Sequence, residues 1–276
     1  MLKIKEWKKP NTLEEAYEVL NLSANNKVVG GGLFLRLASD LTIQTAIDLS
    51  SVVSDEIIEM EDRFVIGAMT TLRTLEINHA LNTAFNQYFK VAVQDIVGVQ
   101  MRNIATVGGT VHSKYGFSDV LTAFAVMDAT LIFYKGGRLP LKTYLEMPRV
   151  GKREKRDLLL AVEIPKDGRT CAFQMMRNSS SDFAILNCAV SKTISGNYEV
   201  AIGARPQRTA FAFETMKVLN LRGESQAKRP FEACIQEAIS HIEADVTFGS
   251  NRFGTAAYRK QIAKVLVKRA LMEVSL

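Results

Sequence analysis

Two glycine-rich segments carry the chemistry that the sequence suggests first. VVGGG occupies positions 28–32 and ATVGGTV occupies positions 105–111, and both include apolar, strand-like residues. Glycine weakens a strand and usually marks a point where another group approaches the main chain closely. Consecutive glycines also direct successive N–H groups toward one point, which favours anion binding. A tight turn or a bulge accounts for either segment alone, but the pair predicts a ligand with two charged groups, such as a diphosphate.

The side chains around these segments indicate a bound cofactor rather than built-in catalysis. Thr106 and Thr110 offer hydroxyl donors to a phosphate. Neither segment has the GxGxxG spacing of a dinucleotide-binding turn or the Gly-Lys-Ser/Thr ending of a P-loop. The histidines, His79, His112 and His241, show no metal-ligand or catalytic-triad spacing. We therefore predict no catalytic side chain and no metal site, and we expect a cofactor to carry the chemistry.

Composition and charge narrow the class of protein. The chain has 276 residues, 47% of them hydrophobic, and a formal net charge of +6. Its basic residues are spread out except in RVGKREKR at 149–156, which is more typical of a solvated loop than of a docking patch. No aromatic-interleaved basic surface suggests a nucleic-acid partner. The longest apolar run is too short to span a bilayer, so we expect no membrane partner.

Cysteine usage indicates a reducing compartment. Cys171, Cys188 and Cys234 are widely spaced, and the sequence contains no CxxC pair. An iron–sulfur cluster or a disulfide framework within this chain is therefore not expected. The first ten residues also lack the apolar core of a signal peptide. These features predict a cytoplasmic protein.

Local patterns predict an α+β fold in which strands, glycine turns and helices alternate. Thr12 and Glu15 have capping-box spacing at the start of a helix. The runs at 56–60 and 63–69 resemble two joined strands, and Gly136–Gly137 predicts a turn after the strand at 131–135. A domain boundary is expected within 163–170. The last helix, within 255–274, has a mostly apolar face that we expect to comprise Tyr258, Ile262, Val265, Leu266, Arg269 and Ala270.

The order of several motifs resembles that of one family. VVGGG at 28–32 is followed by IGAMTTLRTLE at 66–76 and by VQMRNIATVGGTV at 99–111, with Ser118–Asp119 shortly after. This order resembles the FAD-binding (medium) subunit of the molybdenum hydroxylases, which include xanthine, carbon monoxide and nicotinate dehydrogenases. The most specific part is QMRNIATVGG at 100–109. The resemblance continues to the final helix and covers nearly the whole chain.

The resemblance implies a fold and a role. It implies an FAD-binding region over residues 1–166, with vanillyl-alcohol-oxidase-type subdomains at about 1–54 and 55–166, and a C-terminal sheet-and-helix domain over 167–276. FAD would lie between the subdomains. It would accept electrons from the clusters of an iron–sulfur subunit, which a molybdopterin subunit supplies. The flavin would then reduce NAD or another acceptor.

The resemblance also implies which residues hold FAD. Arg102 and Asn103 are expected to position the second glycine segment. Asp119 is expected to accept a hydrogen bond from the cofactor, with a helix cap at Ser118–Asp119 as the alternative. A stretch containing Arg177, Asp182 and Phe183 is expected near the flavin ring. The complete set of expected cofactor-binding residues is Val29, Gly30, Gly31, Gly32, Leu33, Arg102, Asn103, Thr106, Val107, Gly108, Gly109, Ser118, Asp119, Gln174 and Phe183.

Several positions depart from the family pattern. Gly32 stands where Ser or Thr is usual, and Gln174 stands where Lys is frequent. His112, Lys114 and Tyr115 replace a stretch of smaller residues. Two alternatives follow: a structural subunit of such a complex that has lost FAD, or a free-standing FAD oxidoreductase.

Overall fold

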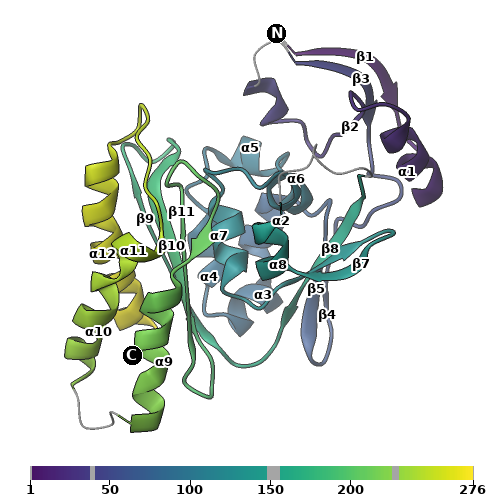
Figure 1. Ribbon diagram of the computed structural model, residues 1–276. Coiled ribbons are helices and arrows are strands. Elements are labelled where there is room, and N and C mark those ends of the chain that lie inside the picture. The colour runs from purple at the N-terminus through teal and green to yellow at the C-terminus, as the bar shows by residue number, and fades with distance from the viewer. Residues whose placement is uncertain (1, 38–40, 148–155, 226–229, 276) are drawn as a thin grey trace.

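Three β-sheets and the helices between them form the described fold (Figure 1). The computed structural model describes residues 2–37, 41–147, 156–225 and 230–275. The predicted solvated loop at 149–156 lies outside these residues except for Arg156. The expected combination of helices and sheets is confirmed. Within the described ranges, no helix has the length and apolar character needed to cross a bilayer.

The first sheet is parallel and supports the first glycine segment. In spatial order it contains β1 (Lys3–Lys8), β3 (Thr42–Ile47) and β2 (Lys27–Val28). The helix α1 (Leu13–Leu22) connects β1 to β2. The Thr12 side chain accepts a hydrogen bond from the Glu15 N–H at 3.1 Å, so the predicted cap is confirmed. The glycines follow β2 directly and lead into a short 3-10 helix, η1 (Leu35–Leu37).

The second sheet is antiparallel and supports the second glycine segment. In spatial order it contains β4 (Ile57–Glu59), β5 (Arg63–Gly67), β8 (Leu159–Pro165), β6 (Thr130–Phe133) and β7 (Gly137–Pro140). The predicted hairpin between β4 and β5 and the predicted turn at Gly136–Gly137 are both confirmed. Gly137 has φ +63°, a backbone conformation that favours glycine.

Short helices fill the chain between β5 and β6. They are α2 (Leu72–Ile77), α3 (His79–Ala84), α4 (Tyr88–Val93), α5 (Val99–Arg102), α6 (Val107–Ser113) and α7 (Asp119–Ala125). A further helix, α8 (Leu141–Glu146), precedes β8. The strand-like interpretation of 105–111 is wrong, because Thr106 caps a helix there and Val107 and Val111 are buried on one of its sides. The valines reflect helix packing rather than a strand.

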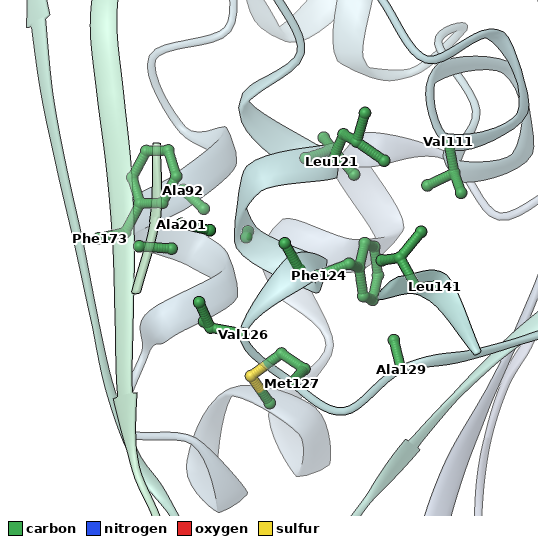
Figure 2. Close-up of a cluster of buried hydrophobic side chains, with 14 of the residues drawn as sticks. Ala92, Val111, Leu121, Phe124, Val126, Met127, Ala129, Leu141, Phe173 and Ala201 are labelled. Carbon is green, nitrogen blue, oxygen red and sulfur yellow. The ribbon is translucent and has the colours of Figure 1, made fainter. Parts of the chain in front are cut away.

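The largest core surrounds α7. Every residue of α7 is buried, including Asp119. Figure 2 shows Phe124 of α7 beside Leu141 of α8, with Phe173 and Ala92 on the other side of the helix. Because α7 also packs against the C-terminal sheet, its N-terminus has a fixed position relative to that sheet.

The third sheet belongs to the C-terminal part of the chain. In spatial order it contains β12 (Ala210–Phe211), β11 (Tyr198–Gly203), β10 (Ala184–Lys192) and β9 (Thr170–Arg177), all antiparallel. The helices that follow are α9 (Phe213–Ser225), α10 (Phe231–Ser240), α11 (Ile242–Asp245) and α12 (Ala256–Glu273). They lie on the side of the sheet away from α7 (Figure 1). Burial on both faces explains why β10 is apolar along most of its length.

The buried face of α12 differs from the expected one. Tyr258 and Val265 are 43% and 48% exposed, and Arg269 is exposed. Arg259 is instead fully buried. Its guanidinium donates to Ile185 O and Gly249 O, both at 2.8 Å, and to the loop that precedes the helix. A charged residue can occupy this core position because carbonyl oxygens accept its hydrogen bonds.

We predict that Arg259→Met lowers the free energy of unfolding by about 3 kcal/mol, because it leaves several buried carbonyls without a donor. Urea denaturation followed by circular dichroism measures this loss. Arg269→Met on the exposed side of α12 is the matched control and is expected to change the stability by no more than about 0.5 kcal/mol. Equal losses in the two variants would contradict this account.

Candidate cofactor site

The two glycine segments lie against each other. A Cβ atom at Gly30 would lie 2.5 Å from Thr106 Oγ1, and one at Gly31 would lie 1.9 Å from Ile104 O. Both distances are too short for any side chain, so only glycine permits this approach. A Cβ atom at Gly109 would lie 3.7 Å from Gly30 O. The absence of side chains therefore brings the loop after β2 and the segment from Ile104 to Gly109, at the start of α6, to one place.

The first segment provides free main-chain donors. Gly31 and Gly32 have φ +56° and +68°, and the Gly32 N–H donates to Gly30 O at 2.5 Å. Within the part of the chain that the structure describes, the N–H groups of Gly30 and Gly31 donate to no protein acceptor. Adjacent free N–H groups on a sharp glycine turn are suited to an anion.

The N–H groups of the second segment mostly bind protein acceptors, which differs from the row of anion-binding donors that the sequence suggested. The N–H groups of Val107 and Gly108 donate to Thr70 O at 2.9 Å and Ala68 O at 2.8 Å, and the Gly109 N–H donates to Thr106 Oγ1 at 3.1 Å. These donors hold α6 against β5 and its following loop. The segment therefore offers the hydroxyl proton of Thr106 and a surface without side chains, rather than a row of free N–H groups.

Both segments line one cavity of about 360 Å³. Gly30, Thr106 and Gly109 lie at one side of it, and apolar residues including Leu35, Leu49 and Leu158 form its walls. A smaller hollow of about 60 Å³ continues past Gly32 and Tyr115. A mostly apolar cavity with a few polar groups is typical of a site for a nucleotide-sized ligand.

Two basic side chains, Lys27 and Arg156, also line the large cavity. Burial, and then the nearby charge of Arg156, lower the pKa of Lys27. The Arg156 guanidinium donates to Asn26 O at 2.6 Å and to the carbonyl groups of Leu20, in α1, and Ser23, the C-cap of α1. Arg156 thus joins the segment before β8 to α1 and the loop that follows it. The positive charges of Lys27 and Arg156 make the cavity attractive to a phosphate.

Other expected site residues support the segments without facing the cavity. The Arg102 guanidinium is buried and contacts the Glu76 carboxylate at 2.7 Å, which fixes α5 to α2. Its side chain thus has the expected positioning role, whereas Asn103 is exposed. Val29 packs with Ile43 and Ala46 under the first segment. Leu33 lines the smaller hollow.

Asp119 joins α7 to the C-terminal sheet, whereas the Ser118 side chain contacts the helices around it. Ser118 Oγ accepts the Leu121 N–H at 3.0 Å, so Ser118 caps α7. The carboxylate of Asp119 accepts from Arg177 and from Asn187, each at 2.6 Å. Burial raises the pKa of Asp119, and the charge of Arg177 opposes this effect. Both carboxylate oxygens of Asp119 thus accept hydrogen bonds from protein groups. The sequence had instead led us to expect a hydrogen bond from the cofactor.

Gln174 and Phe183 have different positions. The Gln174 amide donates to the Glu273 carboxylate of α12 at 2.8 Å, and Gln174 lines neither glycine-walled hollow. Phe183 contacts the rings of Phe34 and Phe117 near Asp119. The structure therefore brings Phe183 toward the glycine segments, whereas the side chain of Gln174, in β9, contacts α12. Phe34 and Phe117 were missed because apolar residues in loops have no distinctive spacing.

The known proteins that resemble this chain agree on one family. Residues 2–167 match the family described as the FAD binding domain in molybdopterin dehydrogenase, and residues 171–274 match the carbon monoxide dehydrogenase flavoprotein C-terminal domain. The chain belongs to this family. The resemblance found in the sequence is thereby confirmed, and so is the assignment of FAD as cofactor. The protein is an FAD-dependent oxidoreductase subunit.

Individual relatives of this FAD-binding protein are distant but match along its length. The glyceraldehyde dehydrogenase medium chain of Sulfolobus acidocaldarius is 23% identical, over 96% of each chain. The carbon monoxide dehydrogenase medium chain of Hydrogenophaga pseudoflava is 25% identical, over 96% of this chain and 95% of that one. The structure of reconstituted CO dehydrogenase from Oligotropha carboxidovorans matches with a TM-score of 0.85 at 23% identity, over 98% and 96% of the two chains. The last match establishes the shared fold.

We predict that Arg177→Met destabilises this FAD-binding protein by about 3 kcal/mol at neutral pH, because Asp119 then stays buried without its cation. The pKa of Asp119 is already raised in the folded state, and the variant raises it further. The folded state of the variant therefore binds the Asp119 proton more strongly than the unfolded chain does. The variant is expected to lose stability as the pH rises through the raised pKa of Asp119, and to regain it as the pH falls.

Urea denaturation at several pH values measures this dependence. Lys217→Met, which removes an exposed ion pair with Glu214, is the control and is expected to cost no more than about 0.5 kcal/mol. A loss in Arg177→Met that stays the same across the acidic range would show that Asp119 does not carry the effect.

Proposed function

We propose that the chain binds FAD with its diphosphate between Gly30–Gly32 and Thr106–Gly109, and relays electrons from a partner's iron–sulfur clusters to an acceptor such as NAD. The observation that supports this proposal most is the contact of the two side-chain-free segments at one cavity. When bound, FAD supplies the electron transfer, since no catalytic side chain is assigned to this chain.

In this proposal, residues of the chain bind the phosphates and exclude water from the cavity. The N–H groups of Gly30 and Gly31 donate to phosphate oxygens, and the Thr106 hydroxyl donates from the facing segment. Lys27 adds positive charge at the cavity. The apolar walls exclude water, which strengthens each of these interactions.

The partners and the finer fold assignment belong to the same proposal. Two relatives are medium chains of dehydrogenases, which favours an iron–sulfur subunit and a molybdopterin subunit as partners of this chain. We also propose the vanillyl-alcohol-oxidase arrangement for residues 1–166, with subdomains at about 1–54 and 55–166 and a C-terminal domain at 167–276. The separate sheets support this division. A cytoplasmic location agrees with Cys171, Cys188 and Cys234, which form no disulfide bond within the described residues.

Gly109→Val tests the position of the diphosphate. A Cβ atom at Gly109 meets only Thr106 Oγ1, at 3.0 Å, and Gly30 O, so the fold is expected to persist. The added methyl groups enter the cavity where the segments meet, and we expect FAD occupancy after reconstitution to fall by about tenfold or more. Flavin absorbance per chain after gel filtration measures the occupancy.

Gly98→Val is the matched control, because a Cβ atom there also lies 3.0 Å from a side-chain oxygen but lines neither hollow. Full flavin occupancy in Gly109→Val would place the diphosphate elsewhere. Failure of the unchanged protein to bind FAD would favour the structural-subunit alternative. NADH oxidation by the isolated, flavin-loaded chain at the rate of a whole complex would favour the free-standing oxidoreductase.

A further inference from the structure

One buried arginine of the C-terminal domain has an unused side to its guanidinium. Arg205, in the loop between β11 and β12, is only 6% exposed. Within the described chain, its side-chain hydrogen bonds all come from Nη1, which donates to Gln207 Oε1 at 2.8 Å and to Thr247 O at 2.6 Å. The Nε–H is buried without an acceptor, and Nη2 donates to none of the described residues. We call the Nε–Nη2 edge of Arg205 the open fork.

The other buried arginines that the structure describes do not share this feature. Arg102, Arg169 and Arg259 each donate from Nε, Nη1 and Nη2 to protein oxygens. Such partners are the rule, because an unpaired charge in a protein interior is costly. A water molecule satisfies an N–H group but does not neutralise the charge. The open fork therefore indicates an acceptor from outside the chain, and a negatively charged one.

The charge around Arg205 is positive. Among the described residues, neither Arg205 nor Arg208 forms an ion pair with a carboxylate. Arg208 Nη1 donates to Met147 O at 2.7 Å, the same oxygen that accepts from Lys114 Nζ at 2.9 Å. Burial, and then the charge of Arg208, lower the pKa of Arg205 to about 10. An anion at the open fork would offset both the burial of this charge and its repulsion by Arg208.

The guanidinium of Arg205 lies just beneath the surface. The Gly249 N–H donates to Arg205 O at 2.8 Å, which fixes the loop. Gln207 and Thr247, whose side chains contact Nη1, are both exposed. Gln207 Oε1 also accepts from Thr247 Oγ1 at 2.6 Å, whereas the Gln207 amide N–H groups donate to none of the described residues. Movement of one exposed side chain would therefore open a path to Arg205 and bring an amide donor to an entering ion.

We propose that the open fork of Arg205 binds a phosphate-type oxyanion. The parallel N–H groups of Nε and Nη2 match two oxygens of such an anion, and a third oxygen accepts from the Gln207 amide. Phosphate is favoured over a carboxylate, because it carries more negative charge at neutral pH and has the additional oxygen. The site is separate from the proposed FAD site, since Arg205 and Arg208 line none of the hollows next to the glycine segments.

Titration calorimetry with inorganic phosphate tests this proposal, with chloride holding the ionic strength constant so that screening does not change. We expect one phosphate per chain at this site, with a dissociation constant on the order of 1 mM. Arg205→Gln should weaken this binding by about tenfold or more, because it removes the fork and its charge. Arg205→Lys keeps the charge without the fork and should weaken it by about fivefold. Arg269→Gln, on the exposed side of α12, is the matched control and should leave the affinity unchanged.

Gly109→Val distinguishes this site from the glycine segments. Phosphate at the open fork should bind to Gly109→Val as it does to the unchanged protein. Loss of binding in Gly109→Val but not in Arg205→Gln would place the phosphate at the glycine segments and overturn the proposal, while leaving the proposed function intact.

Circular dichroism establishes that each variant is folded, and Arg205→Lys decides the question if Arg205→Gln is not. Unchanged phosphate affinity in the folded Arg205 variants would overturn the proposal, as would the absence of saturable binding to the unchanged chain below about 50 mM phosphate. Acetate is the comparison ligand and should bind about tenfold more weakly than phosphate. Acetate binding as tight as that of phosphate would overturn the assignment of a phosphate-type ion and favour a carboxylate.

Discussion

The contact between Gly30 and Thr106 is the constraint on which the rest of the site depends. A Cβ atom at Gly30 would come within 2.5 Å of the threonine hydroxyl, and the carbonyl of Ile104 excludes any side chain at Gly31. The loop after β2 and the segment between α5 and α6 can therefore approach each other this closely only because Gly30 and Gly31 have no side chains. Among the residues that the structure describes, the N–H groups of Gly30 and Gly31 have no protein acceptor, and Gly30 lines the large cavity. Packing and anion binding here have one physical origin.

The remainder of the structure fixes the two walls of that cavity. Arg102 and Glu76 secure the helix before the second segment, and Arg156 secures the loop after α1 to the segment before β8. The buried pair of Asp119 and Arg177 joins α7 to the C-terminal sheet, so the aromatic end of the site contains residues from both domains. The Arg102–Glu76 and Arg177–Asp119 pairs are buried with hydrogen-bond partners, which is the condition for a charge to remain in a protein interior.

Local signals in the sequence predicted local structure well. The Thr12 cap, the β4–β5 hairpin and the turn at Gly136 depend on residues near one another in the chain. The helix at 107–113 could not be predicted in this way, since its valines suit either a strand or a buried helix. Asp119 and Gln174 have hydrogen-bond partners 58 and 99 residues away in the chain. Only the tertiary fold therefore shows that their side chains bind other protein groups rather than the cofactor. The family resemblance identified the segments but not which of them carries free donors.

Backbone hydrogen exchange at the glycine segments tests the central claim most directly. The account predicts that saturating ADP slows exchange in the peptide covering residues 29–33, because the N–H groups of Gly30 and Gly31 then donate to phosphate oxygens. Exchange at Gly108, which is already bonded to Ala68, should change little. Unchanged exchange at 29–33, in a chain that demonstrably binds the nucleotide, would contradict the assignment of the diphosphate to this contact.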